Sequence, residues 1–237
     1  MGNTGVLNLV PPALLWSSAS LLLYMAARRL YRWATHPLLT PVLVTTILLI
    51  AILQVTGTEY DTYMEGGRMI SYFLGPSVVA LGVPLYRNLR ELRSAARAII
   101  PAILVGSIAG VLGAVVPAIL MAAPELMVRS LAPKSVTTPI AISLAELIGG
   151  DPGLTTSFVV VTGIFGAVLG PVILRLAGVK DPTAWGLAMG TAAHGIGTSR
   201  ALERDHVSGA AAGLGICLCG IATSVVTPPL VRLLLGT

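Results

Sequence analysis

Charged residues are scarce in this sequence. Only 11% of the 237 residues are Asp, Glu, Lys or Arg, against about a quarter in soluble globular domains. Hydrophobic residues make up 55%, and the mean hydropathy is +0.87. So few charges do not cover the surface of a soluble protein of this length. The composition therefore excludes a disordered chain, a coiled coil and an ordinary cytosolic enzyme.

Cysteine and aromatic residues are also few. Cys217 and Cys219 lie two positions apart in one apolar segment. Because such positions do not face each other on a helix, they support neither a disulfide nor a metal site and do not indicate a redox compartment. Aromatic residues reach only 5%, whereas the 26 glycines and 16 prolines are many for a helical protein. This mixture is typical of packed membrane helices that contain breaks.

The apolar runs predict an all-α polytopic membrane protein. A membrane-spanning helix needs about 20 residues, so we expect seven to eight membrane segments, including discontinuous or re-entrant helices. We expect one transmembrane domain over 1–237, with a peripheral first helix in 1–36, a first half in 37–121 and a second half in 122–237. The apolar runs are 12–31, 38–54, 69–86, 98–121, 139–148, 155–176, 183–198 and 207–235.

An internal repeat with an offset of 56–57 residues is one interpretation of these runs. Leu74 to Pro76 aligns with Leu131 to Pro133, and Ile108 to Gly110 aligns with Ile164 to Gly166. Each copy is a short broken segment followed by a long glycine-rich helix. Paired broken segments are a common sign of a transporter site, although chance similarity between apolar sequences explains the same match.

Basic residues predict the orientation in the membrane. Arg28, Arg29 and Arg32 and the arginine-rich segment 86–97 are assigned to the cytoplasm, and the acidic loop 55–68 to the outside. The N-terminus then starts outside a bacterial inner membrane. We attribute the net charge of +5 to basic loop residues that set this orientation, and not to nucleic-acid binding. The segment 86–97 is interpreted as a cytoplasmic loop, with a contact for lipid headgroups or a partner as the alternative.

The basic residues do not determine on which side of the membrane the loops after Gly149 lie. If 139–148 crosses the membrane, Arg175 lies outside, and if it re-enters, Arg200 lies outside. The side of the C-terminus is open for the same reason. The glycine-rich runs 98–121 and 155–176 predict tight helix contacts, either within one subunit or in a homodimer.

The segment 134–139 is the first candidate site. Pro139 suits the first turn of a helix with Thr138 as its N-cap, beside Thr137 and Ser135. A helix that begins inside the membrane directs unpaired N–H groups and the positive end of its dipole into the protein. With the hydroxyl groups this makes a site for a carboxylate or phosphate. An ordinary capped helix at the membrane surface explains the same pattern.

The segment 190–200 is the second candidate. His194 is the histidine inside an apolar segment, and its usual pKa suits a proton-coupled step, although a hydrogen-bonded structural histidine is equally compatible with this position. Gly195 and Gly197 would let a backbone or ligand come close, and Thr198 completes the set. Arg200 would bind a carboxylate with its planar guanidinium, but a loop arginine is favoured.

Other chemistry has weaker support. Glu146 is a candidate for proton or ion coupling together with His194, but its place three residues before Gly149 also suits a residue at the membrane surface. The sequence has no GxSxG, HExxH or Walker motif and no metal-ligand spacing. We therefore expect neither an enzyme nor a cofactor.

Four motifs together resemble the LrgB family of antiholin-like membrane proteins, which includes LrgB and CidB. The last motif is the most specific, and the plastid glycolate/glycerate translocators look similar in their C-terminal half. The motifs cover most of residues 37–235: LGPSVVALGVPLYRN from Leu74, KSVTTPIA from Lys134, GG.PGLTTSFVVVTGIFGAVLGP from Gly149 and GLAMGTAAHGIGTSRALE from Gly186.

The resemblance implies a multi-pass inner-membrane protein that often works with a holin-like partner of the LrgA/CidA type. It also implies one of two functions: transport of small monocarboxylates such as pyruvate, glycolate or glycerate, or control of murein hydrolase activity and lysis without transport. Two positions depart from the family pattern. Ser143 stands where an acidic residue is usual, and Cys219 stands where an Asn is common.

Overall fold

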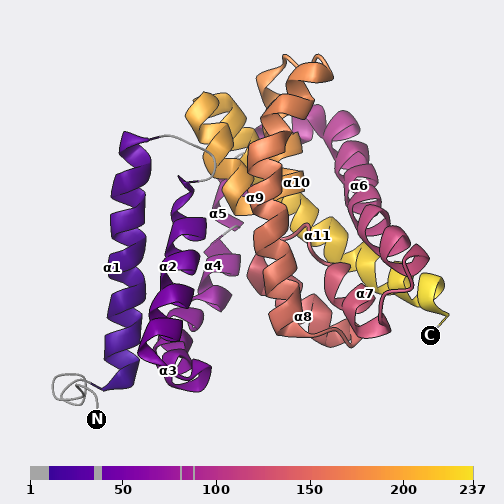
Figure 1. Cartoon of the computed structure of the whole chain (residues 1–237). Coiled ribbons are helices and arrows are strands. Elements are labelled where there is room, and N and C mark those ends of the chain that lie inside the picture. The colour runs from indigo at the N-terminus through magenta and orange to yellow at the C-terminus, as the bar shows by residue number, and fades with distance from the viewer. Residues whose placement is uncertain (1–10, 35–38, 81, 88, 237) are drawn as a thin grey trace, which may run out of the picture. The chain divides into compact units, whose positions relative to one another are not determined.

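The computed structural model describes residues 11–34, 39–80, 82–87 and 89–236, and its elements within these ranges are helices. This confirms the all-helical fold class. The chain forms two compact units, Met1–Ser77 and Val78–Thr237, and each is described by itself (Figure 1). The single domain and the position of the N-terminus, which lies outside the described residues, stay predictions.

The first unit contains α1 (Pro12–Trp33), α2 (Pro41–Thr56) and α3 (Tyr60–Ser71). The bounds of α1 and α2 agree with the apolar runs. The expectation of a loop over 55–68 was wrong, since most of this acidic stretch lies in α3. Its polar residues had suggested a loop, but they belong to an amphipathic helix. This helix packs one face against α1 and leaves the other exposed.

A glycine lets α3 approach α1 closely. A Cβ atom at Gly66 would lie 2.5 Å from the backbone nitrogen of Ser17, so only glycine fits there. Beside it, the rings of Trp16 and Tyr63 meet edge to face with their centres 5.8 Å apart, a favourable geometry for aromatic pairs.

The boundary between the units falls within α4, and the remaining helices belong to the second unit. One expectation about them was wrong: the arginine-rich stretch 86–97 is not a loop, because from Leu89 onward it forms the first turns of α6. The helices are α4 (Leu74–Ala80), α5 (Gly82–Arg87), α6 (Leu89–Leu120), α7 (Glu125–Leu131), α8 (Thr138–Ile148), α9 (Pro152–Leu176), α10 (Pro182–Arg204) and α11 (His206–Leu235).

Three helices in the described ranges are long and apolar enough to cross a membrane. They are Ala95–Leu120, Pro152–Leu176 and His206–Leu235. They support a membrane protein, while the remaining segments of the expected seven to eight stay a prediction. The helix α8 has 11 residues and is about 16 Å long, roughly half the thickness of the hydrocarbon layer.

The long helices α6 and α11 run in the same direction, and α9 runs against them (Figure 1). The early part of α6, at Ile99 and Ile103, shares a buried cluster with Leu214 of α11. The late part of α6, at Val115, shares another with Val231 of α11. Both helices therefore lead from one end of the unit to the other.

We name these ends by their charged residues. The "basic end" carries Arg97 at the start of α6, Arg175 at the end of α9 and Arg204 before α11. The "far end" carries Arg129 in α7 and Arg232 in α11. The helix α9 starts at the far end, where Thr155 donates a hydrogen bond to the Ser130 carbonyl of α7 (2.9 Å).

The helix α10 is broken at its middle and folds back on itself. The backbone leaves the helical region at Ala193 (φ −129°) and His194 (φ 38°, ψ −126°). A Cβ atom at Gly197 would lie 2.3 Å from the Met189 carbonyl oxygen, so the second half returns along the first. The run 183–198 is therefore not one straight segment, and we call residues 182–204 the "α10 hairpin".

A second hairpin enters from the far end. The turn 132–137 between α7 and α8 reaches the middle of α6, where a Cβ atom at Gly110 would lie 3.2 Å from Ser135 Oγ. The helix α8 then returns to the far end, where Arg129 donates a hydrogen bond to the Ile148 carbonyl. We call residues 125–148 the "α7–α8 hairpin".

Candidate functional site

The tip of the α7–α8 hairpin carries the first predicted cluster. The helix begins at Thr138 with Thr137 as its N-cap, one residue earlier than expected, and Pro139 lies in the first turn as expected. The Thr137 side chain does not cap the helix. Its hydroxyl oxygen is buried and has no hydrogen-bond partner among the described residues.

A cation lies beside this helix start. Lys134 Nζ donates a hydrogen bond to Ser135 Oγ (3.3 Å). Ser135 is buried and Lys134 is half-buried. Within the described ranges Lys134 forms no ion pair with a carboxylate. The tip therefore combines an ammonium group, two hydroxyl groups and the positive end of a helix dipole.

The tip of the α10 hairpin is formed by His194 itself. Its ring is buried, and Nε2 lies 3.1 Å from the Val159 carbonyl oxygen of α9. A Cβ atom at Gly163 would lie 2.6 Å from His194 Cε1, so this glycine makes room for the ring. The positive φ of His194 costs about 1–3 kcal/mol for a residue with a side chain, and strain of this kind is most common at functional sites.

The two tips meet in the middle of the unit. Cys219 of α11 lies between them, with Sγ 3.8 Å from the Ser135 carbonyl oxygen and 3.6 Å from the Thr191 carbonyl oxygen. Val159, whose carbonyl faces His194, is in one buried cluster with Val136. The two clusters that the sequence singled out are therefore neighbours, although they are more than 50 residues apart in the chain.

Three further polar residues lie at this junction: two were not predicted from the sequence, and the third belongs to the predicted segment 190–200 but was not singled out. Ser107 of α6 donates a hydrogen bond to Cys219 Sγ (3.7 Å), and Thr223 Oγ1 lies 3.5 Å from the same sulfur. Thr191 Oγ1 is buried without a partner among the described residues. The sequence signal that could have identified these residues is a hydroxyl group inside an otherwise apolar helix.

Other predicted residues take different places. Thr198 Oγ1 donates to the His194 carbonyl (2.9 Å), so it lies at the tip. Gly195 is exposed, and a Cβ atom there would have no neighbour within 4 Å. Arg200 pairs with Glu203 at the basic end, about 9 Å along the helix from His194, and does not join the tip. Glu146 is exposed near the far end of α8.

The side chains at the junction are largely buried. His194 and Ser135 are buried, and Val136, Val159 and Cys219 belong to one buried cluster. A pocket at the basic end is bounded by Arg200 but by no residue of 134–139. In the described part of the chain, no group of three or more His, Cys, Asp or Glu residues is arranged to hold a metal ion.

Comparison with known proteins assigns the chain to a family. The model of the LrgB-like family matches residues 20–233. The chain belongs to the LrgB-like family. YxaC, an uncharacterized protein of Bacillus subtilis, is 36% identical over 210 residues, which are 89% of this chain and 91% of YxaC. The holin-like protein CidB of Staphylococcus epidermidis is 32% identical over 221 residues, 93% of this chain and 96% of CidB. No solved structure matches the chain.

The two positions at which we expect a departure from the family pattern lie in different surroundings. Ser143 is exposed, and its hydroxyl donates to the Pro139 carbonyl of its own helix (3.2 Å). Cys219 lies at the contact between the two hairpin tips. A thiol is a weak donor and acceptor, whereas an Asn amide has two strong donors and a strong acceptor. The second of these positions therefore lies at the junction itself.

Proposed function

We propose that this LrgB-like chain transports a small carboxylate, such as glycolate, glycerate or pyruvate, across the bacterial inner membrane. The meeting of two helix-hairpin tips, one from each end of the membrane-spanning unit, supports the proposal most. Many transporters bind their substrates near the middle of the membrane, where discontinuous helices end.

The chemistry of the tips suits one negative charge. Lys134 supplies a cation, and the first turn of α8 supplies backbone N–H groups that have no partner within the helix. The buried hydroxyls of Thr137 and Thr191 lack a protein acceptor or donor among the described residues. A buried polar group without a partner is costly, and a carboxylate would accept hydrogen bonds from both hydroxyls.

The arrangement of the charges suits alternating access. Arg175 and Arg200 both lie at the basic end because the α10 hairpin turns back, so one of them need not lie outside. We place the basic end in the cytoplasm, as the positive-inside tendency predicts. The α10 hairpin then enters from the cytoplasm and the α7–α8 hairpin from outside. Movement of one hairpin against the other would open the junction to one side at a time.

Uptake by the purified protein tests transport. Proteoliposomes containing the full chain should accumulate labelled glycolate, glycerate or pyruvate above empty liposomes. His194→Ala and Thr137→Val should abolish uptake, because each removes a polar group at a tip. His206→Ala and Thr56→Val, which change exposed residues of the same types, serve as controls and should keep uptake.

Two results would contradict this proposal. One is a folded wild-type protein that carries none of the three acids, alone or with its partner. The other is a wild-type rate in both tip variants, which would move the site elsewhere.

Regulation of a holin-like partner is the second candidate function. The name of the CidB relatives, "Holin-like protein", favours it over transport, and so does the burial of the side chains at the junction. In this alternative the chain would act as an antiholin-like protein on a partner of the LrgA/CidA type and on murein hydrolase activity. The tip residues would then serve packing and helix capping.

Measurements of autolysis and of uptake distinguish the two candidate functions. If the chain regulates lysis without transport, deletion of its gene should change the rate of autolysis, and the chain should copurify with the holin-like partner. His194→Ala, expressed at the wild-type level, should then restore normal autolysis. A variant that loses both uptake and normal autolysis would instead make the change in lysis a consequence of transport.

A further inference from the structure

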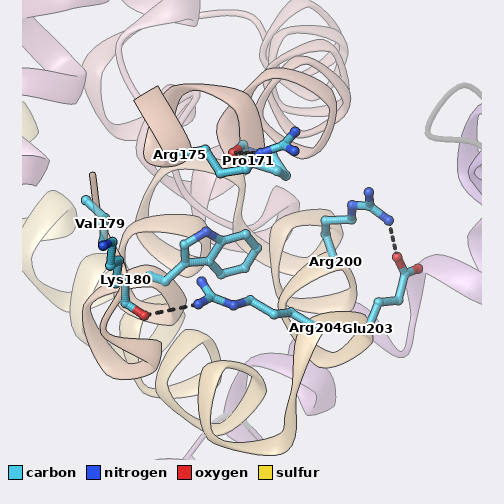
Figure 2. A pocket seen from close by; sticks show the side chains of 8 residues that line it. Pro171, Arg175, Val179, Lys180, Arg200, Glu203 and Arg204 are labelled. Carbon is cyan, nitrogen blue, oxygen red and sulfur yellow. Dashed lines mark hydrogen bonds and ion pairs between the residues drawn. The ribbon is translucent and has the colours of Figure 1, made fainter. Parts of the chain in front are cut away.

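A basic pocket of about 530 Å³ lies at the basic end of the second unit. It is formed by the last turn of α9, the turn that follows and both ends of the α10 hairpin (Figure 2). Four basic side chains and one carboxylate line it, together with a tryptophan: Arg175, Lys180, Arg200, Arg204, Glu203 and Trp185. The excess of positive charge favours an anionic ligand.

The cations of the pocket are held in place by the protein. Arg204 Cζ lies 4.8 Å from the centre of the Trp185 ring, a cation–π contact, and its Nη2 donates to the Lys180 carbonyl (3.1 Å). Arg175 Nε donates to the Pro171 carbonyl (3.2 Å). Arg175 and Arg204 lie on opposite sides of the pocket in Figure 2. Ordering of these long side chains before binding lowers the entropy cost of holding a ligand.

An apolar groove of about 430 Å³ lies along the contact between α9 and α10, and the stretches of the two helices that line it adjoin those that line the pocket. Gly170 lines the groove, and the next residue, Pro171, lines the pocket. The groove follows α9 from Leu174 back to Val161, which is about 20 Å of helix and comparable to an extended fatty-acyl chain. Phe165, on its wall, is 61% exposed, as expected for a face in contact with lipid.

We propose that the pocket and the groove together bind one anionic glycerophospholipid. The phosphate lies between Arg175 and Arg204, and one acyl chain follows the groove toward the hairpin tip. A soluble phosphate would explain the pocket but not the groove, and an uncharged hydrocarbon would explain the groove but not the pocket. This proposal does not depend on the transported substrate, because it concerns the outer surface of α9 and α10.

Quenching of Trp185 fluorescence tests the proposal. With Trp16→Phe and Trp33→Phe, Trp185 is the remaining tryptophan of the chain. The full chain is placed in nanodiscs in which phosphatidylglycerol or phosphatidylcholine carries brominated acyl chains. Phosphatidylglycerol should reach half-maximal quenching at a mole fraction lower than phosphatidylcholine by on the order of tenfold, since each basic residue attracts anionic lipid. Equal quenching by the two lipids overturns the proposal. This comparison needs no substitution of a residue in the pocket.

Variants locate the preference. Arg175→Gln combined with Arg204→Gln should reduce the preference for phosphatidylglycerol to that for phosphatidylcholine. Arg97→Gln removes an exposed charge at the same end but outside the pocket, and it should keep the preference. If Arg97→Gln lost the preference for phosphatidylglycerol as fully as the double variant, the preference would come from the general charge of the basic end. That result would overturn the proposal.

Two further measurements distinguish binding of the lipid head group in the pocket from binding of the acyl chain in the groove. Ala192→Leu narrows the groove without changing charge and should weaken quenching by phosphatidylglycerol. Inorganic phosphate should not displace the lipid at millimolar concentration. Displacement by phosphate, together with normal quenching in Ala192→Leu, would show a site for free phosphate and contradict a lipid site.

Discussion

The two hairpins have tips that meet, but the protein holds them by different means. The α7–α8 hairpin is anchored by hydrogen bonds: Ser130 Oγ accepts from the Asp151 backbone N–H (2.8 Å), and the Ser130 carbonyl accepts from Thr155 (2.9 Å). The α10 hairpin is anchored by close backbone contact. Cβ atoms at Gly186 and Gly190 would each lie 2.1 Å from a carbonyl oxygen of α11.

The turns differ in the same way. The α7–α8 hairpin uses a turn of several residues before the start of α8, and Thr137 keeps an ordinary negative φ of −64°. The α10 hairpin turns at His194, whose φ is positive. One hairpin should therefore be sensitive to loss of hydrogen bonds, and the other to added volume and to the conformation of one residue.

The largest effect is expected from added volume in the α10 hairpin. Gly190→Ala places a methyl group against the Ala212 carbonyl, and because backbone must move, the variant should lose about 3 kcal/mol of stability. Gly195→Ala, where the Cβ position is open, should lose none. Thermal unfolding in detergent measures both, and equal stability of the two variants would contradict the packing described for α10 and α11.

The second effect concerns the hydrogen bonds of the other hairpin. Ser130→Ala leaves the Asp151 N–H without its acceptor in a buried place, so a loss of about 2 kcal/mol is expected. Ser143→Ala removes an exposed hydroxyl of the same hairpin and should change stability little. A loss in Ser143→Ala as large as that in Ser130→Ala would mean that the hairpin is not anchored through Ser130.

The third effect compares one residue in each hairpin. His194→Gly and His194→Ala both lose the contact with Val159, but only glycine relieves the positive φ. The glycine variant should therefore be about 1 kcal/mol more stable than the alanine variant. In α8, the helix that begins at the other tip, Ser143→Gly should instead be less stable than Ser143→Ala, because glycine disfavours a helix interior. Chemical unfolding of the four proteins in detergent measures the two differences, and the same order in both hairpins would remove this contrast.

The smallest effect is a pH dependence at the end of the α10 hairpin. Asp205 accepts hydrogen bonds from the Ser208 backbone N–H and hydroxyl, and these lower the pKa of the Asp205 carboxyl below its usual 3.8. Its contribution to stability is present above that usual pKa and is lost as pH falls below it, through the folded-state pKa. Melting temperatures at pH 7 and pH 3 should differ less in Asp205→Asn, and an unchanged difference would contradict this role.

Much of the helical order was predictable from apolar runs, breaks and caps. The run 139–148 became α8, because Pro139 suits the first turn of a helix and Gly149 its C-cap, with a φ of 75°. The loops at 55–68 and 86–97 were mispredicted, because polar composition alone does not distinguish a loop from a helix at a membrane surface. Both errors concern charged stretches, where hydropathy is a weak guide.

The candidate site was predictable in part. His194 and Thr137 stood out because polar groups inside apolar segments are costly and therefore informative. Arg200 was grouped with them because it follows His194 by six residues, yet the structure directs it to the basic end. Ser107 and Cys219 were not included, since single small polar residues are common in apolar helices.

By itself, the sequence determined that this is a helical membrane protein with short, broken segments that carry its polar residues, because hydropathy and helix-breaking residues act locally along the chain. Only the tertiary structure decided that α10 turns back at His194 and that its tip meets the start of α8. Such contacts depend on which glycine faces allow two backbones to approach, and this complementarity between distant segments is not written in either segment alone.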